Sequence, residues 1–162
     1  TFTAGAVGIA LIALLLVVAL ASTGAVFFFF CLGIQGGYTV GGFGGAALTF
    51  KVDSLPCVFA ADFYLGNSFG LGLTADWWIA NPKIEGTWGW YYGVGLAGTI
   101  HLGDIFALAV GPRALVGTNV FFIDNFLEFY VQAAWQPILS IVPDFGFGWK
   151  SFPINAGFRF WF

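Results

Sequence analysis

Charged residues are scarce in this chain of 162 residues. Asp, Glu, Lys and Arg together make up 8% of it, whereas soluble domains contain about 25%. So few charges could not solvate the surface of an ordinary soluble globule, so that class of protein is excluded. The formal net charge of −3 provides no basic patch, which argues against a nucleic-acid partner.

Histidine and cysteine are also rare. The chain has one histidine, His101, and two cysteines, Cys31 and Cys57. These residues form no cluster with the spacing of metal ligands, so neither a metal site nor a cofactor is expected. The two cysteines fall on the first and third of the strands predicted below, which are not neighbours in a meander, so a disulfide is not expected.

Apolar residues take the place of the missing charges. Hydrophobic residues account for 59% of the chain and aromatic residues for 20%, and the mean hydropathy is +0.90. These values indicate a membrane protein. The apolar residues follow two patterns, a continuous run near the start and an alternation beyond residue 31.

The continuous apolar run covers residues 4–21 and contains no charge. Ala19 and Ala21 place small residues where a signal peptidase reads them, so residues 1–21 are predicted to be a signal peptide cleaved before Ser22, and residues 22–162 the mature domain. No Lys or Arg precedes Lys51, and we infer that the charged start of such a signal is missing from the sequence. A retained transmembrane helix is the alternative, because about eighteen apolar residues suffice to span a bilayer.

Beyond residue 31, apolar and polar residues alternate between turn signals such as the glycines of 41–45 and the pair Gly103-Asp104. Alternation with period two predicts strands that have one apolar and one polar face. The predicted strands are about 31–40, 46–52, 57–65, a fourth between the turn at 66–68 and the polar connection at 81–85, then 87–102, 105–116, 126–137 and 145–162.

Eight alternating strands in a membrane predict a closed barrel. Every backbone N–H and C=O must be paired within a bilayer, so such strands can span only if the sheet closes on itself. The fold class expected is therefore all-β, a closed antiparallel up-and-down eight-stranded transmembrane β-barrel preceded by the apolar signal-like segment. A polytopic helical protein is the structural rival, but the glycines and the alternation in residues 86–103 favour a strand.

Aromatic residues gather near the ends of the predicted strands, where amphipathic rings favour the boundary between membrane and water. These residues are Trp77, Trp78, Trp88, Trp90, Tyr91, Tyr92, Trp135, Trp149 and Trp161.

The polar face of the predicted strands carries almost every ionisable residue within them. These residues are Asp62, Asp76, His101, Arg113, Glu128 and Arg159. An eight-stranded barrel is just wide enough for its own side chains to fill it, and unpaired buried charges are costly, so these charges are expected to pair. The pattern favours a charged plug that fills the lumen. A narrow ion path, or a gate whose charges exchange partners, is the alternative.

The last twelve residues show the alternation most clearly. Apolar residues stand at 152, 154, 156, 158, 160 and 162, and mostly small or polar residues stand between them. This segment, and residues 31–162 as a whole, resemble small bacterial outer-membrane β-barrels of the outer-membrane protein A or X type. The glycine-rich stretches 69–78 and 92–97 are similar to the small barrels of spirochaetes.

This resemblance implies an integral protein of the bacterial outer membrane, in contact with outer-membrane lipid. It also implies that Phe158, Phe160 and Phe162 belong to the signal that the barrel assembly machinery reads. Barrels of this kind include enzymes that act on lipid acyl chains, which makes His101 a candidate beside Thr99 and Asp104. No serine stands at a short spacing on that strand, and a lone histidine at a strand end is typical of a hydrogen-bonded rim residue, so no enzymatic activity is expected.

The predicted connections at the outward end of the barrel, after the first, third, fifth and seventh strands, are short. The longest covers about residues 138–144, which weakens the case for an adhesin. The sequence therefore predicts a non-enzymatic outer-membrane barrel with a structural or surface-interaction role and an unidentified surface ligand. A narrow channel for ions or small solutes is the alternative, and a membrane-lipid enzyme is the more remote one.

Overall fold

The computed structural model describes residues 30–40, 44–52, 56–65 and 69–162. Its elements are β1 (Phe30–Val40), β2 (Gly44–Val52), β3 (Cys57–Leu65), β4 (Phe69–Ala80), β5 (Lys83–Glu85), β6 (Trp88–Leu102), β7 (Ala107–Phe122), β8 (Leu127–Trp135), β9 (Ile138–Val142), β10 (Gly146–Gly148) and β11 (Phe152–Trp161). Within these ranges, no helix is long and apolar enough to cross a membrane. The predicted segment 1–21 and its boundary at residue 22 lie outside the described residues.

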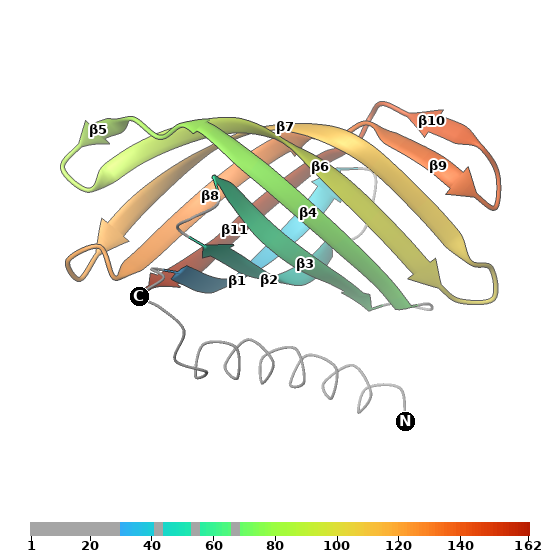
Figure 1. The fold of residues 1–162 in the computed structure, drawn as a ribbon, viewed down its shortest axis with the longest axis horizontal. Coiled ribbons are helices and arrows are strands. Elements are labelled where there is room, and N and C mark those ends of the chain that lie inside the picture. Colours follow the sequence, from blue (N-terminus) through green and yellow to red (C-terminus); the bar gives the residue numbers. More distant parts are fainter. Residues whose placement is uncertain (1–29, 41–43, 53–55, 66–68) are drawn as a thin grey trace, which may run out of the picture.

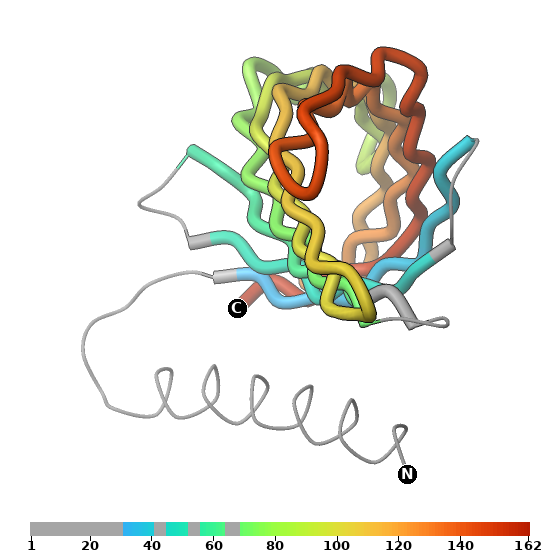
Figure 2. The backbone as a smooth tube through the Cα atoms, turned by 90° about the vertical axis from the view of Figure 1, so that its right-hand side faces the viewer, coloured from blue at the N-terminus to red at the C-terminus, as the bar shows by residue number. Residues whose placement is uncertain are grey.

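The strands close into a barrel. Antiparallel pairing runs in the order β1, β2, β3, β4, β6, β7, β8 and β11, and β11 returns to pair with β1. Figure 2 looks into the resulting ring from the end where β9 and β10 lie. The predicted all-β fold, a closed antiparallel eight-stranded barrel, is confirmed.

The two faces of the wall differ as the alternation predicts. In β6, Trp90, Tyr92, Val94 and Leu96 are exposed, whereas the residues between them are buried in the lumen. In β8, Phe129, Val131 and Trp135 are likewise exposed on the outside. The polar set faces inward and the apolar set outward, which is the reverse of a soluble barrel and is stable only in an apolar surrounding.

The barrel has two distinct ends, best seen in Figure 1. The terminal end holds the start of β1, the end of β11 and the short strand β5, and the opposite hairpin end holds β9 and β10. At about 3.3 Å per residue and a tilt of about 40°, a strand of nine residues spans about 23 Å of the barrel axis, and one of fifteen about 38 Å. Strands β3 and β6 have these lengths, so even the short side of the wall approaches the apolar band of about 25 Å typical of membrane barrels.

The predicted seventh and eighth strands were wrong in detail. The seventh, predicted to run to Pro137, ends at Trp135 as β8, and the eighth, predicted over residues 145–162, is divided into β10 and β11. Both β8 and β9 pair with β7, on either side of Pro137. Proline has no N–H to donate to the ladder, so the pairing is interrupted there. Residues 138–142, predicted to lie in a loop, form β9 and pair with β10 as a hairpin that projects from the wall.

Three other boundaries also differ from prediction. Strand β7 continues to Phe122, beyond the predicted end at Val116, because β8 pairs with it over this length. The polar connection after β4 contains β5, which pairs with the start of β6. The two-residue turn at Gly103-Asp104 is instead a longer connection between Leu102 and Ala107. The expected lack of a disulfide agrees with the two cysteines, which are free and buried.

Candidate functional site

The candidate site is the lumen, because most of the polar groups that the barrel withdraws from solvent lie there. The buried polar and charged residues are Gln35, Thr49, Asp76, Arg113, Asn119, Glu128, Gln132, Asn155 and Arg159. They stand on the inward positions of six different strands. Buried polar groups are costly unless they are paired, so their partners determine what the lumen can do.

The centre of the first polar layer is the Glu128 carboxylate. Arg159 is its register partner on the neighbouring strand β11, and the guanidinium Nη1 lies 3.3 Å from Oε2. Asn119 Nδ2 donates to Oε1 at 2.8 Å, and Trp161 Nε1 donates to Oε2 at 2.9 Å. The Arg159 and Glu128 side chains are 1% and 0% exposed, so this ion pair is fully withdrawn from water.

Aromatic rings complete this layer. The guanidinium carbon of Arg159 lies 3.6 Å from the ring centroid of Tyr130 and 5.4 Å from that of Trp78. Trp78 in turn stacks on Tyr91 with a centroid separation of 4.2 Å. A planar, weakly hydrated guanidinium suits such contacts. Rings and charges together therefore fill the terminal half of the lumen.

A second polar layer lies closer to the hairpin end. Arg113 Nε is 2.8 Å from Asp76 Oδ1, and Arg113 Nη1 donates to Gln136 Oε1 at 2.8 Å. Asp76 on β4 and Arg113 on β7 are not on neighbouring strands, and Gly95 of β6 stands between them in register. A Cβ at this glycine would collide with the Asp76 carboxylate, so the absence of a side chain lets the charges meet across β6.

Two further pairs of polar side chains in the lumen meet across a glycine of the strand between them. Tyr91 on β6 donates from its hydroxyl to Gln132 Oε1 on β8 at 2.9 Å, across Gly117 of β7. Tyr130 on β8 donates to Gln35 Oε1 on β1 at 2.7 Å, across a glycine of β11. Glycines on inward positions thus allow polar side chains to bridge over a strand.

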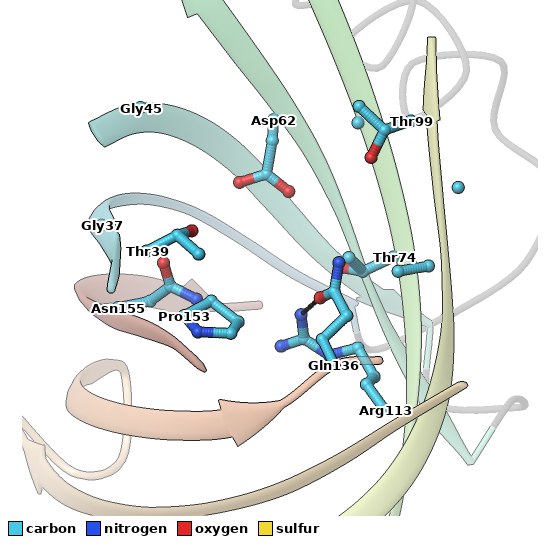
Figure 3. Close-up of a pocket in the computed structure, with 13 residues that line it drawn as sticks. Gly37, Thr39, Gly45, Asp62, Thr74, Thr99, Arg113, Gln136, Pro153 and Asn155 are labelled. Carbon is cyan, nitrogen blue, oxygen red and sulfur yellow. Dashed lines mark hydrogen bonds between the residues drawn. The ribbon is translucent and has the colours of Figure 1, made fainter. Parts of the chain in front are cut away.

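A small polar vestibule lies between the second layer and the hairpin end. Its cavity measures about 30 Å³, within an empty volume of about 460 Å³ that is partly open to solvent. A water molecule needs about 10–15 Å³ of cavity measured in this way, so the vestibule has room for about two waters or a small ion. Figure 3 shows Asp62 facing Arg113 and Gln136 across this space. The lining also includes Thr39, Thr74, Thr99, Pro153 and Asn155.

Comparison with known proteins identifies the architecture. No family model and no curated protein sequence matches the chain. The crystal structure of Neisserial surface protein A superposes with a TM-score of 0.51 at 14% identity, over 83% of this chain and 97% of that one. The chain has the fold of an outer-membrane β-barrel. A loop-deleted form of OmpT, an outer membrane protein of Vibrio cholerae, matches with a TM-score of 0.28 at 13% identity, over 85% of this chain and 40% of that one.

The six predicted charges of the outer-membrane barrel have three different outcomes. Asp76 with Arg113, and Glu128 with Arg159, form the two ion pairs. Asp62 lines the vestibule instead of joining either pair. The sixth, His101, joins neither pair and does not line the vestibule.

His101 lies near the hairpin end of β6, where Gly70 and Ala107 are its register partners. It is half-buried and does not line the vestibule, although Thr99 does. Asp104 lies in the connection beyond the strand and is exposed. The part of the chain described here holds no group of three or more His, Cys, Asp or Glu residues that could bind a metal.

Several aromatic residues of the site were assigned to the wrong surface. Trp78, Tyr91 and Trp161 were predicted at the membrane boundary, but they lie inside the barrel. Trp78 and Trp161 contact the charges of the first layer, and Tyr91 stacks on Trp78. The alternation of each strand could have placed these three residues inside the barrel, because their neighbours in the sequence are apolar and face outward. Tyr130 and Gln132 were correctly placed on the inward face, but the contact of Tyr130 with Arg159 and the hydrogen bond from Tyr91 to Gln132 were not predicted.

Proposed function

We propose that this outer-membrane barrel is non-conducting and non-enzymatic, and that its role is structural or depends on contacts made outside the lumen. The observation that supports this proposal is that each of the two polar layers of the lumen contains a buried ion pair. The four side chains of Asp76, Arg113, Glu128 and Arg159 are at most 6% exposed. Both layers would have to open before a solute could pass.

Opening either polar layer would cost a large amount of free energy. Breaking a buried ion pair by removing one partner typically costs about 3–5 kcal/mol, because it leaves an uncompensated charge. Glu128 would also lose its hydrogen bonds from Asn119 and Trp161. Thermal opening of both polar layers at the same time is therefore rare, which supports a permanent plug that stiffens the barrel.

The hairpin end supports a role in surface interaction. Phe145 and Phe147 of the β9–β10 hairpin are 80% and 67% exposed, and Ile105 in the nearby β6–β7 connection is 67% exposed. Strand β9 pairs with β7 just beyond that connection, so these apolar groups lie at the same end of the molecule. Exposed apolar groups clustered in this way are typical of contact surfaces.

A narrow channel is the second candidate, and the polar vestibule favours it. Asp62 and Thr99 provide oxygen ligands at the hairpin end, and Arg113 closes the path beyond them. If that guanidinium exchanged Asp76 for Asp62, the second layer would open. The first layer would still have to open for ions to cross.

Planar-bilayer conductance of the full chain, first confirmed folded by a heat-dependent gel shift, tests the proposal. We expect silence from the wild type, from Asp76→Asn/Arg113→Gln and from Glu128→Gln/Arg159→Gln, because one intact layer suffices to close the lumen. Only the variant that combines all four changes should conduct. Asp62→Asn is the matched control outside both layers and should stay silent. Steady, salt-dependent conductance by the folded wild type would contradict the plug and support the narrow channel.

The absence of enzymatic activity needs its own test. Folded wild type and His101→Ala are incubated with phospholipid vesicles, and release of fatty acid is measured. We expect no release above background from either protein. Release that disappears in His101→Ala would instead support the membrane-lipid enzyme.

We also propose that the outward rings of β11 are read by the barrel assembly machinery. The Phe158 and Phe160 ring centroids are 5.6 Å apart, and Phe126 contacts Phe160 and Phe162 at 5.6 Å each. Phe162→Ala should lower the folded fraction in bacterial outer membranes, whereas Phe147→Ala, on β10, should not. Equal folded fractions in the two variants would contradict the proposal.

A further inference from the structure

A shallow trough crosses the outer wall near the terminal end. Its floor follows one register row in which β7, β8 and β11 contribute the small or medium side chains Thr118, Val131 and Ala156. The next register row toward the terminal end contains Val120, Phe129 and Phe158, and Trp88 of β6 extends this row by one strand. Tyr130 and Gly157 complete the lining, and we call this hollow, lined by these nine residues, the wall trough.

The wall trough is large enough for a ligand. Its volume is about 400 Å³, and the hollow is largely open toward the surroundings. The volume lies within the range of about 300–1,000 Å³ found for small-molecule sites, but the hollow would cover only one side of a ligand. It extends over β6, β7, β8 and β11, so at about 4.8 Å between neighbouring strands its length is about 14 Å. The rings of Phe129 and Phe158, with centroids 6.0 Å apart, form one side.

The chemistry of the wall trough suits a hydrocarbon. Its polar groups already have partners, because Trp88 Nε1 donates to Thr118 Oγ1 at 2.8 Å and that hydroxyl donates to the Gly89 carbonyl at 2.9 Å. The remaining lining is the aliphatic and aromatic surface of outward residues. An unfilled hollow forfeits dispersion contacts along its lining, so filling it with a hydrocarbon chain is favourable.

We propose that the wall trough binds one acyl chain of a membrane phospholipid in the leaflet at the terminal end. The lipid-facing position of the wall makes acyl chains the most abundant apolar partner. A second copy of the barrel is disfavoured because lipid tails are as apolar as a protein wall, so apolar burial does not drive association within a bilayer. The inference rests on the outer-membrane location and not on whether the lumen conducts.

The test uses the full chain refolded into phosphatidylethanolamine and phosphatidylglycerol vesicles that contain a phospholipid with a photoactivatable diazirine in one acyl chain. After illumination, cross-linked peptides are mapped by mass spectrometry. We expect labelling concentrated on the segments of β8 and β11 that line the wall trough, and reduced by excess unlabelled phospholipid. Uniform labelling around the wall would overturn the proposal.

Two matched substitutions make the test specific. Ala156→Phe fills the floor of the wall trough, whereas Ala114→Phe adds the same ring to another exposed outward alanine outside it. The concentrated labelling should be lost in the first variant and retained in the second, and Val131→Phe is the alternative filling variant if Ala156→Phe does not fold. Unchanged labelling in a folded filling variant would refute the site.

Discussion

Gly117→Ala is the substitution that probes the lumen most directly. A Cβ at this position would lie 2.5 Å from Tyr91 Cζ and 2.6 Å from its hydroxyl oxygen. The ring is fully buried and stacked on Trp78, so it has little room to retreat. The added methyl group must therefore break the hydrogen bond from Tyr91 to Gln132 that passes over the glycine.

The expected cost has two parts. Leaving a buried polar group without its partner costs about 1–3 kcal/mol, and forcing an extra methyl group into a packed interior costs about another 1–3 kcal/mol. Gly117→Ala should thus lower the free energy of unfolding by about 2–6 kcal/mol. Gly98→Ala is the control, because a Cβ at Gly98 has no atom within 4 Å. Removing a glycine at a compatible position stabilises by about 0.4–1 kcal/mol.

The assay is reversible urea unfolding of the protein in lipid vesicles, followed by tryptophan fluorescence and by the heat-dependent gel shift. The two variants should move the unfolding midpoint in opposite directions. A Gly117→Ala protein as stable as Gly98→Ala would refute the reasoning. It would mean that the Tyr91 ring can leave its place without loss, so the bridges over glycines would not hold the lumen together.

Three further predictions concern the charges and the thiols. Glu128→Ala should destabilise the barrel by about 3–5 kcal/mol, because it leaves Arg159 buried without a counter-charge. In the same urea titration, the double variant Glu128→Leu/Arg159→Met should recover most of this loss. Equal losses in the two proteins would contradict the paired arrangement. Thr99→Cys, in the vestibule, should react with a charged thiol reagent in the folded protein, whereas Thr49→Cys, which is fully buried, should not, as measured by mass increase. Both native cysteines are buried and should react with the same reagent only after denaturation; reaction at the folded stage would show that the wall opens.

Strand identity and facing could be predicted from local pattern alone. The alternation in β6 and β8 separates outward Val94 and Phe129 from inward Gly95 and Glu128, and a period of two depends only on neighbouring residues. This is why Asp62, Asp76, Arg113, Glu128 and Arg159 could be placed on the inward face from the sequence. Strand β9 was missed, because Pro137 and Pro143 on either side of residues 138–142 are typical of a loop.

The partners inside the lumen could not be predicted in the same way. Asp76 meets Arg113 across Gly95 only because β4, β6 and β7 pair in one particular register. Register and stagger are properties of the closed ring as a whole, and the sequence of a single strand does not contain them. For the same reason, Trp78 was assigned to the membrane boundary, since its place near a strand end outweighed its inward position.

The pairing of β1 with β11 has a consequence for how the barrel forms. This seam joins Cys31 to Trp161 at one end and Val40 to Phe152 at the other, so it brings together opposite ends of the described chain. Before β11 is added, β1 and β8 each present a row of unpaired N–H and C=O groups, and every such group costs several kcal/mol in hydrocarbon. A membrane-inserted barrel that lacks its last strand is therefore not a slightly weaker barrel but an unstable one. Insertion and closure must proceed together, with the strand made last completing the structure begun by the first.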